Sequence, residues 1–157
     1  MTHRIKRFLG QRYYPTPLLV VDLDLVASKY SEILKMLPLA QIFYAVKANP
    51  DPQLLKTLCK LGSSFDAASK TEVELCLAAG SPPERISYGN IVKKEIEIAS
   101  TFEQGIRLFA FDSVEELNKI ARSAPGSSVY CRILTSGDKA DWPLSRKFGC
   151  ELDMARD

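Results

Sequence analysis

Histidine is almost absent from this sequence: His3 is the only one in 157 residues, and it lies close to the N-terminus. Any reaction that needs an imidazole as acid or base must take that group from elsewhere. Cysteine is also scarce, and none of the four is spaced as C-x-x-C or has a histidine near it. This favours free thiols in a reducing cytosol over a disulfide framework or a zinc site. The four are Cys59, Cys76, Cys131 and Cys150.

Long apolar runs and a strong net charge are missing as well. No apolar stretch approaches the roughly 20 residues that span a bilayer, and the basic start is not followed by the apolar core of a secretory signal. The net charge of +2 is too small to predict binding to nucleic acid or to an anionic membrane. Neither G-x-G-x-x-G nor a Walker loop occurs, which disfavours dinucleotide and P-loop proteins. We therefore expect a cytoplasmic globular protein without a metal.

Short apolar segments alternate with segments of helical periodicity along the whole chain, in units of roughly 20 to 30 residues. Helices are expected at 24–36, 52–61, 70–79, 93–102 and 113–124, with another beginning near 152. Strands are expected at 18–22, 41–47, 63–67, 85–88, 106–111 and 128–134. Strand 41–47 hardly alternates, so we expect both of its faces to be buried. This pattern predicts a parallel sheet covered by helices.

Residues that begin helices and turns support these boundaries. Asp24 is expected to cap the first helix, and Pro52 suits the first turn of the second. Ser113 and Glu116 have the residue types and the spacing of a capping box. The polar segment 135–146, rich in turn-forming residues, is expected to be a mobile loop.

Polar residues follow the strands, which helps to choose between two parallel architectures, an open doubly wound sheet and a (β/α)₈ barrel. In a barrel, the chemistry gathers at the carboxyl ends of the strands. Residues at or near such ends are Lys47, Asp66, Asn90, Asp112 and Arg132, which favours the barrel. A barrel needs about 250 residues. We therefore expect this chain, with about five central strands, to be a piece of a larger protein, with two open sheet edges and an exposed apolar lining.

Lys47 ends the most apolar of these strands and is the strongest candidate for a catalytic residue. Burial disfavours the charged form of a lysine and lowers its pKa. A neutral lysine amine can form a Schiff base with a carbonyl compound. The alternative is an ordinary solvated lysine one step beyond a core strand, because most lysines are exposed.

Five segments, in order, resemble the motifs of the fold-type III pyridoxal-phosphate decarboxylase family, which includes the eukaryotic-type ornithine decarboxylases. They lie at 43–49, 62–72, 88–94, 111–117 and 132–149. The resemblance implies a TIM-like (β/α)₈ barrel of the alanine racemase type, with about the first five β/α units present. It also implies an N-terminal arm over 1–16 and the first part of the barrel domain over 17–157, with the C-terminal β domain absent.

The resemblance also implies roles for residues around the cofactor, pyridoxal 5′-phosphate. Lys47 would form the covalent bond to it, and Ala45 would lie beside it in the barrel. Asp66 and Glu72 would be the acidic residues near the ring and its histidine partner. From the residues alone, Asp66 could equally be a turn residue that ends a strand, and Glu72 a charge favoured by the helix macrodipole.

Two more roles follow from the later motifs. Arg132 would approach the cofactor from a later strand end, and Lys147 would bridge to the partner subunit of a homodimer. Asn90 matches a position at the edge of the site. The alternatives are a surface ion pair for Arg132 and a solvated loop for Lys147.

The function implied by the resemblance is decarboxylation of a basic amino acid, with L-ornithine giving putrescine for polyamine biosynthesis as the first choice. Alternatives are lysine, diaminopimelate or arginine decarboxylation, a more distant racemase, or a non-catalytic homologue that binds a regulator. The family's ring-stacking histidine, phosphate loop and substrate-binding residues have no counterpart before Asp157. We therefore expect the 157-residue chain alone to bind the cofactor poorly and to be inactive.

Overall fold

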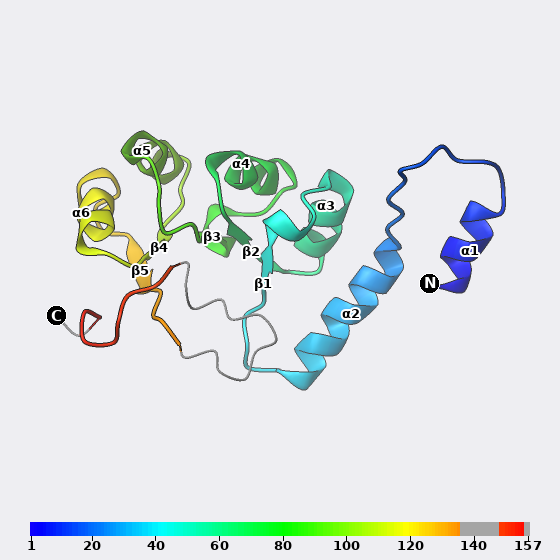
Figure 1. Ribbon diagram of the computed structural model, residues 1–157, viewed down its shortest axis with the longest axis horizontal. Coiled ribbons are helices and arrows are strands. Elements are labelled where there is room, and N and C mark those ends of the chain that lie inside the picture. The colour runs from blue at the N-terminus through cyan, green and yellow to red at the C-terminus, as the bar shows by residue number, and fades with distance from the viewer. Residues whose placement is uncertain (136–147, 156–157) are drawn as a thin grey trace. The chain divides into compact units, whose positions relative to one another are not determined.

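The computed structural model describes residues 1–135 and 148–155, and it divides the chain into two compact units, 1–40 and 41–157 (Figure 1). Each unit is described by itself. The boundary expected between an arm at 1–16 and a domain at 17–157 stays a prediction. Lys147 and nearly all of the loop 135–146 lie outside the described residues.

The first unit contains two helices, α1 (His3–Leu9) and α2 (Leu23–Met36). Asp22 rather than Asp24 caps α2, because the Asp22 carboxylate accepts a hydrogen bond from the Leu25 N–H at 3.3 Å. Asp24 lies in the first turn and pairs with Arg4. The strand expected at 18–22 is wrong: within the described residues this segment pairs with no strand. An apolar run becomes a strand only where a neighbour satisfies its backbone groups.

The second unit is built on five parallel strands in the order of the chain. They are β1 (Phe43–Ala45), β2 (Ser64–Ala67), β3 (Ile86–Tyr88), β4 (Leu108–Phe111) and β5 (Ser128–Cys131). Ala45 pairs with Asp66, and Asp66 pairs with Ser87, so these residues form one row across the sheet. The expected alternation of parallel strands and helices is confirmed.

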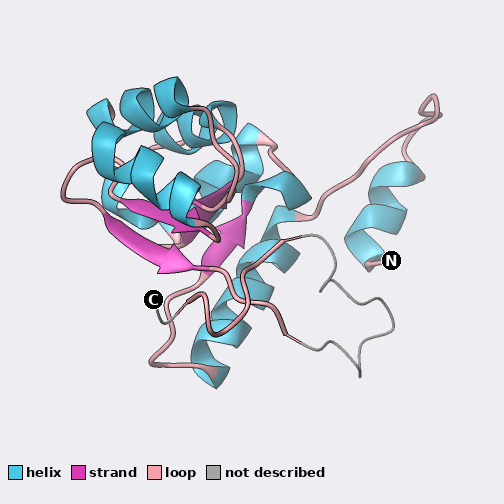
Figure 2. Cartoon of the chain, turned by 60° about the vertical axis from the view of Figure 1, so that its left-hand side comes forward, coloured by secondary structure: helices cyan, strands magenta, loops and turns pink. Residues whose placement is uncertain are grey.

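Four helices connect the strands: α3 (Pro52–Lys60), α4 (Lys70–Ala78), α5 (Glu95–Glu103) and α6 (Val114–Ser123). One-turn 3₁₀ helices are η1 (Val46–Ala48) and η2 (Pro83–Arg85). The helices α3 to α6 lie along one side of the sheet (Figures 1 and 2). A doubly wound sheet would carry helices on both faces and reverse its strand order. Sequential order with one-sided helices is instead the winding of a barrel.

Side chains alternate along each strand between the helix side and the opposite side. The helix side is the core, where the buried strand residues Phe65, Ile86, Tyr88 and Phe109 meet the buried helix residues Val73, Cys76, Ile98 and Ile120. On the opposite side no helix of this unit covers the described strands (Figure 2). The prediction that strand 41–47 is buried on both faces is therefore wrong: β1 is an edge strand and is half-buried.

Two further predictions concern the end of the chain and membrane-spanning segments. The helix expected from about 152 is, within the described residues, one turn in which the Ala155 N–H donates to the Glu151 carbonyl at 3.1 Å. No described helix is both long and apolar enough to cross a membrane.

Candidate active site

The uncovered face of the sheet encloses a hollow of about 480 Å³. Its lining is apolar except for one carboxylate and two hydroxyl groups. The lining residues are Phe43, Ala45, Asp66, Ser87, Leu108 and Tyr130. They come from all five strands, so the hollow exists because the strands alternate and only one of their faces is covered by helices.

Asp66 is the charged group of this hollow, and its position is fixed. Its Oδ1 accepts hydrogen bonds from the Ser87 hydroxyl at 2.8 Å and from the Tyr130 hydroxyl at 3.4 Å. The pKa of Tyr130 is raised by burial and then by the Asp66 charge. Ser87 and Tyr130 were missed in the sequence, although each is the polar member of an alternating strand, Ile86-Ser87-Tyr88 and Val129-Tyr130-Cys131.

Gly89 leaves the space that Asp66 occupies. A Cβ atom added to Gly89 would overlap the Asp66 carboxylate. The Gly89 N–H donates to the Ala67 carbonyl at 2.8 Å, so the backbone cannot move away without losing a sheet hydrogen bond. The side chain of Asp66, not the glycine, must therefore give way in any larger variant.

Gly89→Ala is expected to lower the free energy of unfolding by about 1–3 kcal/mol, the usual cost of overpacking. In the Asp66→Ala background the same change should cost much less, because the overlapping atoms are gone. Urea denaturation of the four proteins in this cycle measures the difference. Equal costs in both backgrounds would show that Gly89 does not make room for Asp66.

Lys47 lies in η1, directly after β1, and its side chain is exposed. The expected desolvation is wrong, because β1 ends at Ala45 and, in the turn that follows, Val46 is completely buried whereas Lys47 is exposed. Within the described residues, the amine of Lys47 takes part in no hydrogen bond or ion pair. The structure thus shows the alternative considered for Lys47, a solvated lysine one step beyond a core strand. Its amine is accessible next to β1, one of the strands that line the hollow.

The other predicted cofactor residues that the structure describes, Glu72 and Arg132, follow strand ends but do not line the hollow. The Glu72 carboxylate accepts a hydrogen bond from the Ala68 N–H at 2.6 Å, while Ser69 caps α4. This contact matches the alternative considered for Glu72, a negative charge that stabilises the N-terminus of a helix. The guanidinium of exposed Arg132 lies 5.6 Å from the centre of the Phe148 ring. Among the predicted residues within 1–135 and 148–155, Ala45 and Asp66 are those that line the hollow, and the cofactor roles of all these residues stay predictions.

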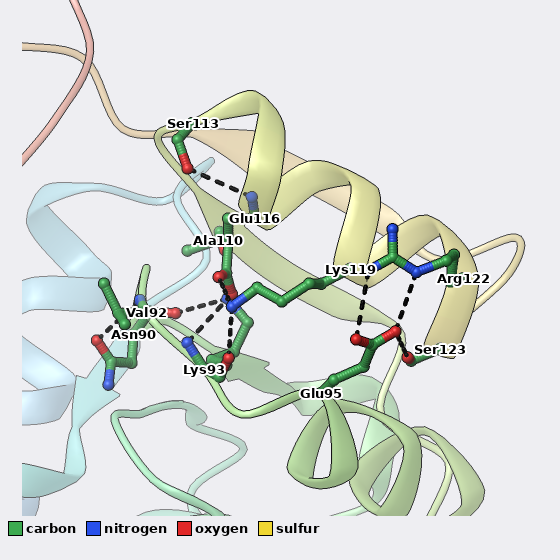
Figure 3. A network of polar contacts seen from close by, with 10 residues as sticks. All are labelled: Asn90, Val92, Lys93, Glu95, Ala110, Ser113, Glu116, Lys119, Arg122 and Ser123. Atoms are coloured by element: carbon green, nitrogen blue, oxygen red, sulfur yellow. Dashed lines mark hydrogen bonds and ion pairs between the residues drawn. The ribbon is translucent and has the colours of Figure 1, made fainter.

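A buried ionic network joins the loop after β3 to α6 (Figure 3). The Lys93 amine, with a fully buried side chain, is 2.8 Å from the Glu116 carboxylate. It also donates to the carbonyls of Asn90 at 2.7 Å and Ala110 at 2.6 Å. Lys119, which is partly exposed, lies 2.5 Å from the second Glu116 oxygen. The two buried charges, Lys93 and Glu116, are therefore paired with each other, as buried charges require.

Glu116 corrects one expectation from the sequence. Ser113 does accept a hydrogen bond from the Glu116 N–H at 3.3 Å, so it caps α6 as predicted. The Glu116 carboxylate does not complete a capping box, because it binds the Lys93 amine and the Lys93 N–H, the latter at 3.2 Å. The network fixes the Asn90 carbonyl, and so the loop after Gly89. Burial lowers the pKa of Lys93, and Glu116 opposes that shift.

Comparison with known proteins identifies the family. Residues 23–157 match the family model described as pyridoxal-dependent decarboxylase, pyridoxal binding domain. The chain is 39% identical over 143 residues to the lysine/ornithine decarboxylase of Selenomonas ruminantium, covering 91% of this chain and 36% of that protein. It is 42% identical over 137 residues both to the ornithine decarboxylase of Rattus norvegicus and to antizyme inhibitor 2 of Xenopus laevis, covering 87% of this chain and 30% of each.

Solved structures agree with this assignment. The lysine decarboxylase of Selenomonas ruminantium and a mutant of SrLDC in complex with PLP superpose with TM-scores of 0.86 and 0.88, each at 36% identity, over 100% of this chain and 41% of theirs. The chain belongs to the pyridoxal-binding domain family of the pyridoxal-dependent decarboxylases. Its fold is the first part of their alanine-racemase-type barrel, as predicted. It spans about a third of the length of the curated relatives it matches.

Proposed function

We propose that the complete protein is a pyridoxal-5′-phosphate-dependent carboxy-lyase that converts L-ornithine to putrescine for polyamine biosynthesis. The family model and the relatives named as ornithine and lysine/ornithine decarboxylases support a basic amino acid as substrate. One structural observation carries the proposal. The amine of Lys47 is exposed and unpaired within the described residues, two positions after Ala45 in the wall of a hollow that also presents Asp66.

The residues present fit this cofactor. A hollow of about 480 Å³ is within the range of cofactor sites, which are mostly apolar with a few fixed polar groups. The short side chain of Ala45 leaves space against β1, and Asp66 is the fixed polar group. In the proposed complex Lys47 would hold the cofactor covalently, Ala45 and Asp66 would lie beside it, and Glu72 from the first turn of α4 and Arg132 from the segment after β5 would approach it.

The cofactor, when bound, supplies an electron sink for the electron pair left behind by carbon dioxide. The residues of this chain supply the surroundings. Lys47 would provide the amine that bonds to the cofactor aldehyde. Asp66, fixed by Ser87 and Tyr130, offers an anionic acceptor to a cationic or N–H group. The apolar side chains of Phe43 and Leu108 exclude water from part of the hollow.

Assembly and location are part of the proposal. We place the protein in the cytoplasm, which agrees with four cysteines that are all free. We propose a homodimer of the full-length protein with Lys147 at its interface. Because the family's other site residues are not found in this sequence, the 157-residue chain by itself is proposed to be inactive.

Two other functions are open to the same fold. Lysine, diaminopimelate or arginine decarboxylation would use the same residues of this chain with a different substrate pocket. A non-catalytic homologue that binds a regulator is favoured by one observation, the 42% identity to a relative named antizyme inhibitor 2. That identity equals the identity to rat ornithine decarboxylase, so overall similarity does not separate the two.

Release of carbon dioxide by the purified full-length protein tests these functions. The substrates are L-ornithine, L-lysine, L-arginine and meso-diaminopimelate, each supplied with pyridoxal 5′-phosphate. We expect the highest kcat/KM with L-ornithine and, after borohydride reduction, cofactor attached to the peptide that contains Lys47. A preference for another substrate would overturn the ornithine assignment. No release from any substrate, with the Lys47 peptide unlabelled, would indicate the non-catalytic homologue.

A further inference from the structure

Two of the four cysteines lie against each other at the edge of the sheet. The sulfur atoms of Cys131 and Cys150 are 3.3 Å apart, although 19 positions separate the residues in the chain. Cys131 ends β5, and Cys150 forms a parallel bridge with Ile133. Side chains two positions apart on a strand share a face. Cys131 therefore lies diagonally across from Cys150 on neighbouring strands, a position from which the two side chains can meet.

Three hydrogen bonds hold the backbone around Cys150. Its N–H donates to the Arg132 carbonyl at 2.9 Å, and its carbonyl accepts from the Leu134 N–H at 2.9 Å. The preceding Gly149 N–H donates to the Asp112 carboxylate at 2.9 Å. Gly149 has φ +111°, and a Cβ there would lie 3.0 Å from the Ile133 backbone, so the chain can turn here only with glycine. The contact between the sulfurs therefore rests on a fixed backbone.

We propose that Cys131 and Cys150 form a reversible disulfide, a modification site whose oxidants are low-molecular-weight disulfides. The Cys131 thiolate attacks one sulfur of the oxidant, and the other sulfur leaves and takes up a proton as a thiol. The Cys150 thiolate then attacks the Cys131 sulfur of this mixed disulfide and expels the second thiol. Two cysteine thiols lose two protons and two electrons, and one disulfide becomes two thiols.

Exposure decides the order of the two attacks. Cys131 is half-buried, whereas Cys150 is buried and 6% exposed, so a dissolved oxidant reaches Cys131 first. Burial raises the pKa of Cys131 to about 11, and the Cys150 thiol and the Asp112 carboxylate act in the same direction. The thiolate fraction is therefore small at neutral pH, and the reaction is expected to be slow there. The rate should keep rising by about tenfold per pH unit above pH 8.5, where the reaction of a thiol with the ordinary pKa of about 8.5 levels off.

The bond would tie Cys150 covalently to β5 next to Arg132, whose carbonyl already holds the Cys150 N–H. It would therefore secure the bridge that extends the sheet beyond β5. The two remaining cysteines are natural controls. Cys76 is buried, Cys59 is half-buried, and among the described residues no hydrogen bond joins their sulfurs.

Incubation of the full-length protein with mixtures of reduced and oxidised glutathione tests the site. After alkylation of remaining thiols and proteolysis, we expect peptides containing Cys131 and Cys150 to be linked, with the mass of two hydrogen atoms lost and restored by dithiothreitol. Cys59→Ser should leave the linkage unchanged. Cys131→Ser and, independently, Cys150→Ala should abolish it. No linked peptide at any ratio of the two glutathione forms, or a persistent glutathione adduct on Cys131, would overturn the proposal.

Discussion

Lys47→Ala in the full-length protein is expected to lower the decarboxylation rate by at least about 10³-fold, because the amine that bonds to the cofactor is lost. The same change should alter the free energy of unfolding by no more than about 0.5 kcal/mol, the usual range for exposed positions. The structure supports this second expectation, since Lys47 is exposed and makes no polar contact within the described residues. Turnover assays and urea denaturation of the same preparations measure both.

Lys56→Ala is the matched control, because Lys56 is also an exposed lysine in the same part of the chain. It should leave both turnover and stability unchanged. Retention of more than a tenth of the activity by Lys47→Ala would remove Lys47 from the proposed chemistry. A large loss of stability would show that the lysine has a structural role that its exposure does not reveal.

Glu116→Gln is expected to destabilise the protein by about 3–5 kcal/mol, because it leaves the buried Lys93 ammonium without its counter-charge. Glutamine keeps the size of the side chain, so a cavity does not explain the loss. Glu115→Gln, at the exposed neighbouring position of α6, is the control and should cost less than about 0.5 kcal/mol. Chemical denaturation compares the three proteins.

Removing both charges distinguishes the effect of an unpaired buried charge from the effect of altered packing. In Lys93→Met/Glu116→Leu, neither buried ion remains, so the double variant should be more stable than Glu116→Gln. Such replacement of a buried pair by apolar groups is often close to neutral. A double variant less stable than Glu116→Gln would mean that the hydrogen bonds of Lys93 to Asn90 and Ala110 contribute more than the charge pair does.

The pH dependence gives an independent test of the same network. Burial lowers the pKa of Lys93 below its ordinary value of 10.5. Between the lowered and the ordinary pKa the unfolded chain holds more protons than the folded one, so this lysine makes stability rise with pH. Glu116→Gln removes a charge that raises the Lys93 pKa, which extends this window downward. The stability deficit of Glu116→Gln should therefore shrink as the pH rises toward 10.5, and a constant deficit would contradict this account.

Much of the architecture was predictable from local chemistry. Glycine and proline set the helix limits, Ser113 marked the start of α6, and apolar runs gave the five parallel strands of the second unit. The run at 18–22 shows the limit of that approach. Its residues are as apolar as those of a strand, but strand formation depends on a partner that local sequence does not specify.

The candidate site was predictable to the level of strand ends, because parallel strands place their carboxyl ends at one edge of the sheet. Lys47 and Asp66 were found in this way. The exposure of Lys47 was not, since it depends on where β1 ends and which way the next turn faces. The hydrogen bonds of Asp66 to Ser87 and Tyr130 join strands that are 21 and 64 residues away along the chain.

The amino-acid sequence alone determined the family and the order of strands and helices in the second unit, because short segments specify both. The tertiary structure alone decided which charges meet. Position 93 was expected to begin a helix and Glu116 to complete a capping box, yet the side chains of Lys93 and Glu116 are 0% and 4% exposed and form one ion pair. Burial and pairing are properties of contacts between distant segments, and a local pattern cannot set the distance between them.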